Sequence, residues 1–418
     1  MSRSFRTELP GSGLRRGGGL LRLAAVWPWW LQVSLVYLAA RIVSACIFMA
    51  AALHQGINPW YPPSPGYWDF ISIWDGHWYA QAAQNGYPSV LPLNADGSVE
   101  ENTWAFYALF PALSRGLSML TGLGILPALT IVAMLAGLGA ALVVFLLFRE
   151  FADRGTALWG VVFFSTFPVS AVLQVPYAEP LNLLLLAASL LLVVRRRYLA
   201  AMPVVVLMCL SRPTGVPFAA MVGLFLAYQC WLKFVRGRAD AAGGNVPGTK
   251  ELAALGALAV VSAAGALAWP LLAWARTGDI RAYTRTETAW RGDDLVPFKP
   301  WFDTGQTLFG PMLGILAPFV FAGLFALMLM SPPARALGTE LRLWCACYMG
   351  YLLVFLHPQT STFRMLLPLF PLALGAALLS RSRAYRGTVT VMFILLQIVW
   401  IVWLWAWAQL PGGGDYPP

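Results

Sequence analysis

Carboxylates and arginines are the side chains of this sequence whose types and positions could carry chemistry. Asp69 and Asp75 lie in an aromatic-rich run, Glu179 directly precedes a proline, and Arg212 and Arg364 flank apolar segments. A carboxylate can act as a general base, and an arginine can hold a phosphate through charge-assisted hydrogen bonds. The sequence contains no P-loop, Gly-rich dinucleotide turn, nucleophile elbow or metal-ligand cluster. These residues therefore favour transfer of a group from an activated phosphate donor, with no tightly bound cofactor and with the metal requirement left open.

The first acidic group belongs to the run WDGHWY, residues 74–79, in which aromatic rings surround a carboxylate. Aromatic rings can stack on the faces of sugars, and a carboxylate among them can deprotonate a hydroxyl group. The alternative is an amphipathic helix at the membrane interface, whose acidic residues are simply solvated. The residues expected to contact a substrate here are Asp69, Trp74, His77, Trp78 and Tyr79.

Three arginines are candidates for binding the phosphate. Arg212 lies between two short apolar runs, Arg41 lies inside the first apolar run, and Arg364 follows His357 at the end of another run. An arginine in hydrocarbon costs about 2.5 kcal/mol or more, so it normally faces a polar cavity or a partner. The alternative for Arg41 and Arg364 is that their side chains reach out to the lipid headgroups. We expect all three to contact phosphate, with His357 among the substrate-binding residues.

Glu179 and the neighbouring Tyr177 form a further candidate group, within PVSAVLQVPYAEPLNL at residues 168–183. Glu179 begins a predicted helix, and acidic residues favour helix N-termini. The residue is therefore either an exposed helix cap or a ligand contact. We include Tyr177 and Glu179 among the expected substrate-binding residues.

Apolar helices must position these residues, because the composition is unsuited to a soluble surface. The chain has 418 residues, 59% of them hydrophobic and 11% charged, and its mean hydropathy is +0.67. A soluble domain carries about a quarter charged residues. Crossing a bilayer takes about 20 apolar residues, so the sequence predicts an all-α polytopic membrane protein with about 11 transmembrane helices, within about 10–13. The runs lie near 27–53, 122–148, 156–175, 180–194, 198–210, 214–232, 252–275, 306–331, 341–356, 365–380 and 388–410.

The distribution of basic residues predicts the orientation of these helices. With a cytoplasmic N-terminus, most Lys and Arg residues fall in the inner connections, while the acidic residues favour the outer ones. This pattern explains the net charge of +10 without nucleic acid. We expect a multi-pass protein of the cell membrane, whose candidate residues lie on the extracytoplasmic side. Its parts are a cytoplasmic basic tail (1–26), one transmembrane unit (27–410) with outer loops at 54–121 and 276–305, and an extracytoplasmic tail (411–418).

Several motifs resemble those of PIG-V-like mannosyltransferases, which are integral membrane glycosyltransferases of the GT-C type. WDGHWYAQAAQNGYP, from residue 74, resembles the WDG-x-WY…GY signature of that family's first lumenal loop. Weaker matches follow in the same order. They are FYALFP at 106–111, with Ala108 for the usual Pro; PYAE at 176–179, with Ala178 for Ser; SRPTG at 211–215; and the segment from Phe363-Arg364 to Pro371.

The resemblance implies a GT-C fold whose long first outer loop carries interfacial helices and the general base. Carried over by motif, that base is Asp75. The resemblance further implies a polyprenyl-phosphate-mannose donor and inverting transfer to a membrane-associated glycolipid or glycan. The two alanine departures place the identity of the acceptor in doubt more than the type of reaction.

Two other functions are compatible with the residues. A transporter or flippase of lipid-linked sugar would also place arginines around a cavity, although no inverted repeat is visible and the acids gather in one outer loop. A non-catalytic subunit of a glycan pathway is the third candidate. The expected partners are the lipid-linked donor, the acceptor and membrane lipids, with no nucleic acid, and we expect a monomer.

Overall fold

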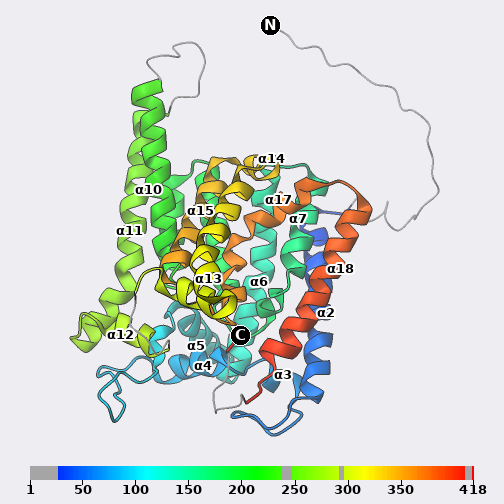
Figure 1. Cartoon of the computed structure of the whole chain (residues 1–418), viewed down its shortest axis with the longest axis vertical. Helices are drawn as coiled ribbons and strands as arrows, with labels where there is room; N and C mark the ends of the chain where they lie inside the picture. The colour runs from blue at the N-terminus through cyan, green and yellow to red at the C-terminus, as the bar shows by residue number, and fades with distance from the viewer. Residues whose placement is uncertain (1–26, 237–246, 291–295, 410–416) are drawn as a thin grey trace, which may run out of the picture.

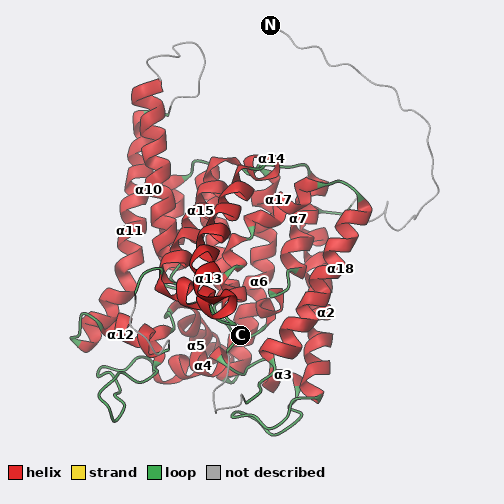
Figure 2. Cartoon of the chain, viewed as in Figure 1, coloured by secondary structure: helices red, strands yellow, loops and turns green. Residues whose placement is uncertain are grey.

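The protein is built from α-helices joined by short 3-10 and π turns. The computed structural model describes residues 27–236, 247–290, 296–409 and 417–418. Within these ranges no β-strand forms, apart from one isolated bridge between Leu93 and Val99 (Figure 2). The predicted all-α class is therefore confirmed. The predicted basic tail 1–26 lies outside the described residues, as does most of the tail 411–418.

Six helices in the described ranges are long and apolar enough to cross a membrane. They are α2 (Trp29–Leu53), α6 (Ile125–Arg149), α10 with its π turn (Gly215–Phe234), α11 (Thr249–Thr277), α13 (Lys299–Met330) and α18 with its π turn (Arg383–Trp405). A bent pair, Thr362–Leu369 and Pro371–Leu379, makes a seventh if its halves, 74° apart, form one broken span. These helices confirm a multi-span membrane protein.

The predicted apolar runs all coincide with helices, but the predicted count of about 11 crossings is not confirmed. The run 156–175 shows why. Its helix α7 (Arg154–Thr166) stops before Pro168 and continues only as a 3-10 turn, η2 (Ser170–Gln174). Proline keeps the preceding residue extended and lacks an N–H group, so this run is not one long helix. The other shorter helices of the bundle are α8 (Glu179–Val194), α9 (Tyr198–Cys209), α15 (Gly338–Phe355), α16 (Thr362–Met365) and α17 (Pro371–Leu379).

Helix α6 packs closely against α2 and α8, because its buried face consists of small residues. Ala133 and Ala140 are fully buried. A methyl group on Gly137 would lie only 2.1 Å from the Tyr37 hydroxyl, which donates a hydrogen bond of 3.1 Å to the Leu173 carbonyl. Small residues allow helices in lipid to approach each other. This contact fixes the turn that leads into α8.

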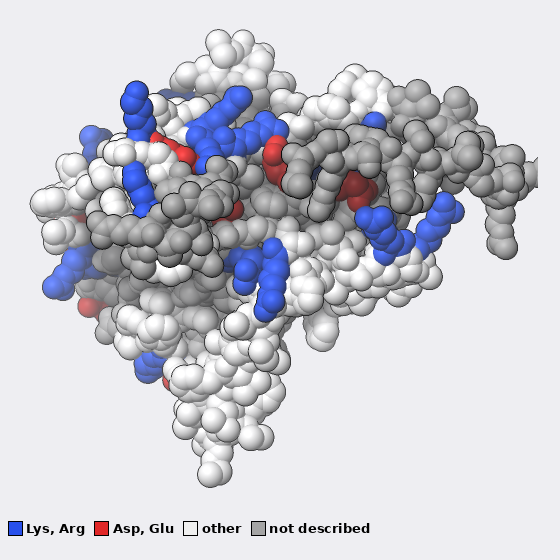
Figure 3. Space-filling model, turned by 90° about the horizontal axis from the view of Figure 1, so that it is seen from above, with Lys and Arg blue, Asp and Glu red and all other residues white. Residues whose placement is uncertain are grey.

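Among the described residues, arginines predicted on the inner side gather at one end of the bundle. Ion pairs join the connections there: Arg195–Glu150 at 2.7 Å, Arg196–Glu251 at 3.2 Å and Arg381–Asp153 at 3.4 Å. Figure 3 views the molecule from this end and shows many Lys and Arg side chains with few acidic ones. Connections that the charge pattern assigned to one side of the membrane therefore lie together.

At the opposite end, the two large loops fold into short helices (Figure 1). These are α3 (Tyr67–Phe70), α4 (Asp75–Asn85), η1 (Thr103–Ala105), α5 (Leu109–Thr121) and α12 (Ala282–Ala289). On α5, Met119 and Leu120 are 70% and 87% exposed, while Phe110 is fully buried. A helix with one buried and one exposed apolar side is typical of the membrane interface.

Helix α13 folds back on itself instead of running straight. Gly310 has φ 78° and ψ 173°, outside the helical region. The two arms touch, because Trp301 stacks on Phe321 with ring centroids 5.5 Å apart. Trp301 also donates a hydrogen bond of 3.1 Å to the Leu352 carbonyl of α15. The first arm of α13 therefore lies against the end of the bundle where the short helices gather.

Candidate functional site

Four charged side chains from four separate segments form one network at the end of the bundle that carries the short helices. Asp75 Oδ2 lies 2.5 Å from Arg364 Nη1, which also lies 3.2 Å from Glu179 Oε1. The same oxygen of Glu179 lies 2.7 Å from Arg212 Nη1. The charges alternate and sum to zero, which allows ionised groups to remain buried. All four residues come from the connections that charge patterning assigned to the outer side.

The network is largely removed from solvent. The side chain of Asp75 is 13% exposed and that of Glu179 is 5% exposed. Burial is the largest influence on Arg212 and disfavours its charged form, but the attractions of Glu179, Tyr79 and Asp75 together outweigh it and raise the pKa of Arg212 above its ordinary value. Arg212 therefore stays charged at any physiological pH, and its field acts at low dielectric, where it is strongest.

Contacts on both sides hold Asp75 at the start of α4. The preceding residue, Trp74, has φ 62° and ψ −127°, a conformation that bulky residues rarely adopt. Such strain costs about 1–3 kcal/mol and persists where the surroundings impose it. Here Trp74 Nε1 donates to the Trp405 carbonyl at 2.8 Å, and the Asp75 N–H donates to the Tyr177 hydroxyl at 3.2 Å. The turn thereby directs the Asp75 carboxylate toward Arg364.

Glu179 lies at the start of α8, where Pro180 suits the first helical turn. Its Oε1 forms ion pairs with both arginines, whereas its Oε2 is buried and has no hydrogen-bond partner within the described ranges. A buried acceptor without a partner costs about 1–3 kcal/mol. Tyr177, fully buried, places its ring 5.2 Å from the Arg364 guanidinium carbon. Glu179 Oε2 is thus an acceptor that a ligand hydroxyl group can satisfy.

A buried asparagine holds the connection that carries Arg212. Asn182 Nδ2 donates to Ser211 Oγ at 2.9 Å and to Thr214 Oγ1 at 2.8 Å. The sequence analysis did not identify Asn182. Its position three residues after Glu179 places both on one side of a helix, and this spacing was the available signal.

The charge network lines a cavity of about 360 Å³, within the range of about 300–1,000 Å³ typical of small-molecule sites. Its walls include several aromatic rings, contributed by both large loops and by α15. Chemically, the cavity offers two guanidinium groups to a phosphate and two carboxylates to hydroxyl groups. Phe106 and Tyr107 of the FYALFP motif also line it, and the wall residues that sequence reasoning did not identify include Tyr283, Trp290, Tyr348 and Tyr351.

Six of the predicted site residues line this cavity: Asp75, Tyr79, Glu179, Arg212, His357 and Arg364. Trp74 and Tyr177 lie behind the lining and position it. The predicted outer loop 276–305 contributes Tyr283, Glu287 and Trp290 to the wall, while residues 291–295 lie outside the described part of the chain.

Three predicted substrate contacts lie elsewhere. Asp69 is an exposed residue of α3 and does not line the cavity. His77 and Trp78 line a second pocket on α4. Trp78 and Tyr79 are neighbours in the motif, but consecutive residues of a helix face about 100° apart. Tyr79 therefore lines the cavity, whereas Trp78 lines the second pocket.

Arg41 is buried in α2 and lies outside the cavity lining. Its guanidinium donates to the Ser165 carbonyl at 2.6 Å, to Ser170 Oγ at 3.0 Å and to the Ser170 carbonyl. The last carbonyls of a helix lack partners within that helix. Arg41 donates to one of them, the Ser165 carbonyl near the end of α7, and to the Ser170 carbonyl of η2. This placement supports neither a phosphate contact nor a headgroup contact, because the guanidinium group already donates hydrogen bonds to Ser165 and Ser170.

Within the residues that the structure describes, no three His, Cys, Asp or Glu side chains gather as metal ligands would. Asp75 and Glu179 are each engaged by an arginine. The sequence leaves the metal requirement open, and adding a chelator to an activity assay would test it.

No family model matches this chain, and no curated protein sequence matches it closely enough to count as a relative. Among solved structures, it is similar to the oligosaccharyltransferase AglB of Archaeoglobus fulgidus in complex with an inhibitory peptide and a dolichol-phosphate, at 14% identity and a TM-score of 0.43. The match covers 88% of this chain and 55% of that one.

Two further structures of the Archaeoglobus fulgidus oligosaccharyltransferase are similar. The apo form gives 13% identity and a TM-score of 0.43, covering 90% of this chain and 56% of that one. The complex with Zn and sulfate gives 15% identity and a TM-score of 0.37, covering 88% and 49%. This chain thus spans about half the length of the structures it matches. The likeness concerns the fold alone and, at these low values, carries no argument about activity.

Proposed function

We propose that this protein is an inverting glycosyltransferase that moves a sugar from a polyprenyl-phosphate donor to a membrane-associated acceptor. The observation that carries the proposal is the buried network of Asp75, Arg364, Glu179 and Arg212 around one cavity. Two arginines suit the phosphate of a lipid-linked donor, and a carboxylate beside them suits an acceptor hydroxyl. This is the chemistry that the residue types favour from sequence.

In the proposed reaction, Asp75 removes the proton from the acceptor hydroxyl. The acceptor oxygen forms a bond to the anomeric carbon, while the bond from that carbon to the phosphate oxygen breaks. The electron pair leaves with the lipid phosphate, so attack from the opposite face inverts the anomeric configuration. Arg212 and Arg364 stabilise the charge that develops on the phosphate, as preorganised cations do in a dry site.

The ion pair between Asp75 and Arg364 has a consequence for this reaction. Asp75 Oδ2 lies 2.5 Å from Arg364 Nη1, so the ion pair occupies the oxygen that would accept the proton. A donor phosphate beside Arg364 would compete for the same guanidinium group. We therefore propose that donor binding frees the Asp75 carboxylate to accept the proton of the acceptor hydroxyl, which couples deprotonation of the acceptor to the presence of the donor.

The donor sugar that we propose is mannose, and we propose transfer on the extracytoplasmic face. The resemblance to PIG-V-like enzymes supports both. Residues from each of its motifs line the cavity, including Asp75, Phe106, Glu179, Arg212 and Arg364. The gathering of basic residues at the opposite end of the bundle supports the orientation. The proposed acceptor is a glycolipid or glycan, and the proposed working form is a monomer.

The test is sugar transfer by purified protein in lipid, supplied with polyprenyl-phosphate-mannose and a membrane glycolipid extract. The decisive variant is Asp75→Asn, which keeps the size of the side chain and removes the base. Asp69→Asn is the matched control, because Asp69 is exposed and lies outside the cavity lining. Removing a general base lowers rates by about 10²–10⁴-fold, so we expect at least a ~100-fold loss for Asp75→Asn and none for Asp69→Asn.

Three results would count against parts of the proposal. Equal rates for Asp75→Asn and the parent would remove Asp75 as the base and make Glu179 the next candidate. Transfer of another lipid-linked sugar, with none of mannose, would keep the reaction and correct the donor. If the parent makes no product but moves lipid-linked sugar between leaflets, the protein is a flippase.

A further inference from the structure

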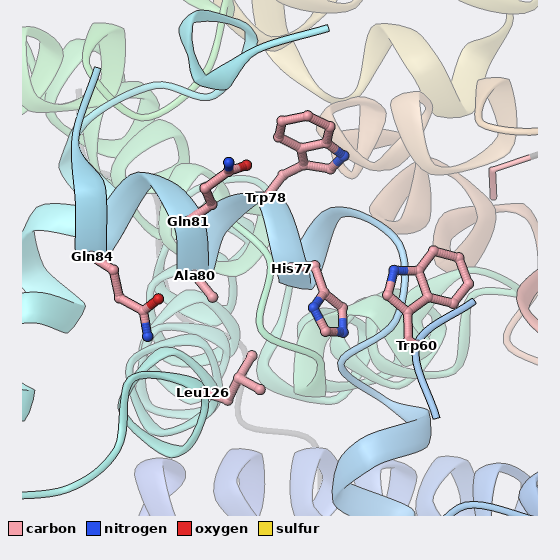
Figure 4. A pocket seen from close by; sticks show the side chains of 7 residues that line it. All are labelled: Trp60, His77, Trp78, Ala80, Gln81, Gln84 and Leu126. Atoms are coloured by element: carbon pink, nitrogen blue, oxygen red, sulfur yellow. The ribbon is translucent and has the colours of Figure 1, made fainter. Parts of the chain in front are cut away.

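A second pocket lies on another side of α4 and takes no part in the site described above. Its volume is about 510 Å³. The residues that line it are Trp60, His77, Trp78, Ala80, Gln81, Gln84 and Leu126. His77, Ala80, Gln81 and Gln84 follow one another at the spacing that places residues on one side of a helix. Figure 4 shows His77, Ala80 and Gln84 pointing to the same side of α4 as Leu126.

The lining of this pocket is polar without charged residues. Gln81 and Gln84 are exposed amides, each with donors and an acceptor. Burial lowers the pKa of His77 below its ordinary value, so the imidazole is neutral at physiological pH. His77 Nε2 is buried and has no hydrogen-bond partner among the residues that the structure describes. Among the described lining residues there is no Lys, Arg, Asp or Glu.

This combination selects a class of ligand. A phosphate or a carboxylate would find no cation here, and a cationic headgroup would find no anion. A purely apolar chain would cover the exposed amides of Gln81 and Gln84 without giving them hydrogen-bond partners, and it would leave His77 Nε2 unpaired, which is unfavourable. A neutral molecule with many hydroxyl groups and apolar ring faces satisfies both the amides and the indole rings of Trp60 and Trp78. Pyranose sugars have this chemistry.

The pocket shares a wall with the catalytic cavity. Trp78 lines the pocket, and its ring stacks on Phe106 with centroids 5.8 Å apart and 8° between the planes. Trp78 also meets Trp290 edge-on at 4.9 Å. Phe106 and Trp290 both line the cavity that contains Asp75. A saccharide bound here would therefore lie next to the place where its neighbouring unit reacts.

We propose that this second pocket, on α4, is a sugar-binding subsite that holds a distal pyranose unit of the acceptor glycan. The acceptor role rests on the proposed function, whereas sugar binding itself does not. The subsite explains how an enzyme with a single catalytic cavity selects an acceptor that already carries sugar. It predicts that acceptors bearing further sugar units bind more tightly than a single sugar-bearing lipid.

The first experiment measures binding without any transfer. The parent protein in nanodiscs is titrated with soluble α-mannotriose, and saturation-transfer NMR gives the dissociation constant. His77→Phe keeps an aromatic ring and removes the unpaired nitrogen, and Gln84→Ala removes an exposed amide from the helix. Losing one hydrogen bond weakens binding about 3- to 10-fold, so we expect that loss for each variant. Trp68→Leu is the control, since Trp68 is 65% exposed on α3 and lies outside the pocket.

The second experiment measures transfer kinetics. We expect His77→Phe and Gln84→Ala to raise the KM for a glycan-bearing acceptor about 3- to 10-fold, with the KM for the donor unchanged. Variant-sensitive binding of mannotriose supports the sugar subsite even if no transfer occurs, a result that would count only against the proposed function. Mannotriose affinity equal in parent and variants would overturn the subsite. Displacement of mannotriose by glycerophosphocholine at equal concentration would overturn it in favour of a lipid-headgroup site.

Discussion

At the scale of residues, the main feature is a carboxylate that pairs with two arginines. Glu179 Oε1 forms ion pairs with Arg212 and Arg364, while its Oε2 has no hydrogen-bond partner in the described part of the chain. Removing one member of a buried ion pair is costly because the remaining charge keeps its desolvation penalty without its partner. The network is therefore expected to behave as a unit, in which the loss of one charge is partly relieved by the loss of its partner.

A double-mutant cycle tests this coupling. Glu179→Gln should destabilise the fold by about 3–5 kcal/mol, because it leaves the buried Arg212 without its ion-pair partner. Arg212→Met should cost less, because Glu179 keeps its ion pair with Arg364. The double variant should lose clearly less than the two single losses combined. The measurement is the thermal unfolding midpoint of each variant in the same detergent. The control is Arg285→Met, because the exposed pair of Arg285 with Asp279 should contribute only about 0–1 kcal/mol. Additive losses would show that the two side chains are not coupled.

At the scale of elements, the site depends on segments that make no direct contact with a substrate. The strained start of α4 is fixed by the end of α18 through Trp405 and by the turn before α8 through Tyr177. That turn follows η2. Arg41 of α2 holds η2 by donating to the Ser170 hydroxyl, the Ser170 carbonyl and the Ser165 carbonyl. The helices of the bundle thus position the acidic residues through a short chain of buried hydrogen bonds.

A substitution of Arg41 tests whether this residue has a structural role or binds phosphate. Arg41→Met removes the guanidinium donor to the Ser170 carbonyl and one of the two donors to the Ser165 carbonyl, and a buried acceptor left unpaired costs about 1–3 kcal/mol. We expect a lower unfolding midpoint and less active protein, with an unchanged KM for the donor in the folded fraction. Arg212→Lys is the comparison, because losing the planar guanidinium should raise the KM for the donor. A higher donor KM for Arg41→Met would return Arg41 to the phosphate-binding residues.

At the scale of the whole molecule, the two ends of the helix bundle differ in charge and in structure. One end carries the arginine-rich connections joined by ion pairs, and the other carries the short helices and the cavity. Positive residues stay on the cytoplasmic side of a membrane. This polarity supports the proposed placement of the cavity on the extracytoplasmic face.

Cysteine labelling tests that orientation. In a variant with its five native cysteines replaced, Ala95→Cys places a thiol on the first loop and Ala384→Cys places one at the basic end. Both positions are exposed. In intact cells, an impermeant maleimide should label Ala95→Cys and should reach Ala384→Cys only after the membrane is permeabilised. The reverse pattern would invert the topology and move the proposed reaction to the cytoplasmic face.

The sequence allowed several parts of the site to be predicted, and the reasons are local. Arg212, Arg364 and Glu179 stand out because charged residues are rare and costly beside apolar runs. Asp75 stands out through its aromatic neighbours. The tyrosines of α15 could not be found in this way, because an aromatic residue in a helix has the same local sequence signal whether it faces a cavity or a neighbouring helix.

The sequence by itself determined that this is an all-α, multi-span membrane chain, because hydropathy depends on composition within one short segment. It also determined which connections carry positive charge. Only the tertiary structure decided which charges meet. Asp75 and Arg364 are 289 residues apart in the chain, and Arg41 turns toward a helix end instead of the cavity. Such contacts depend on how distant helices pack and where each one breaks, and no local pattern in the sequence specifies that packing.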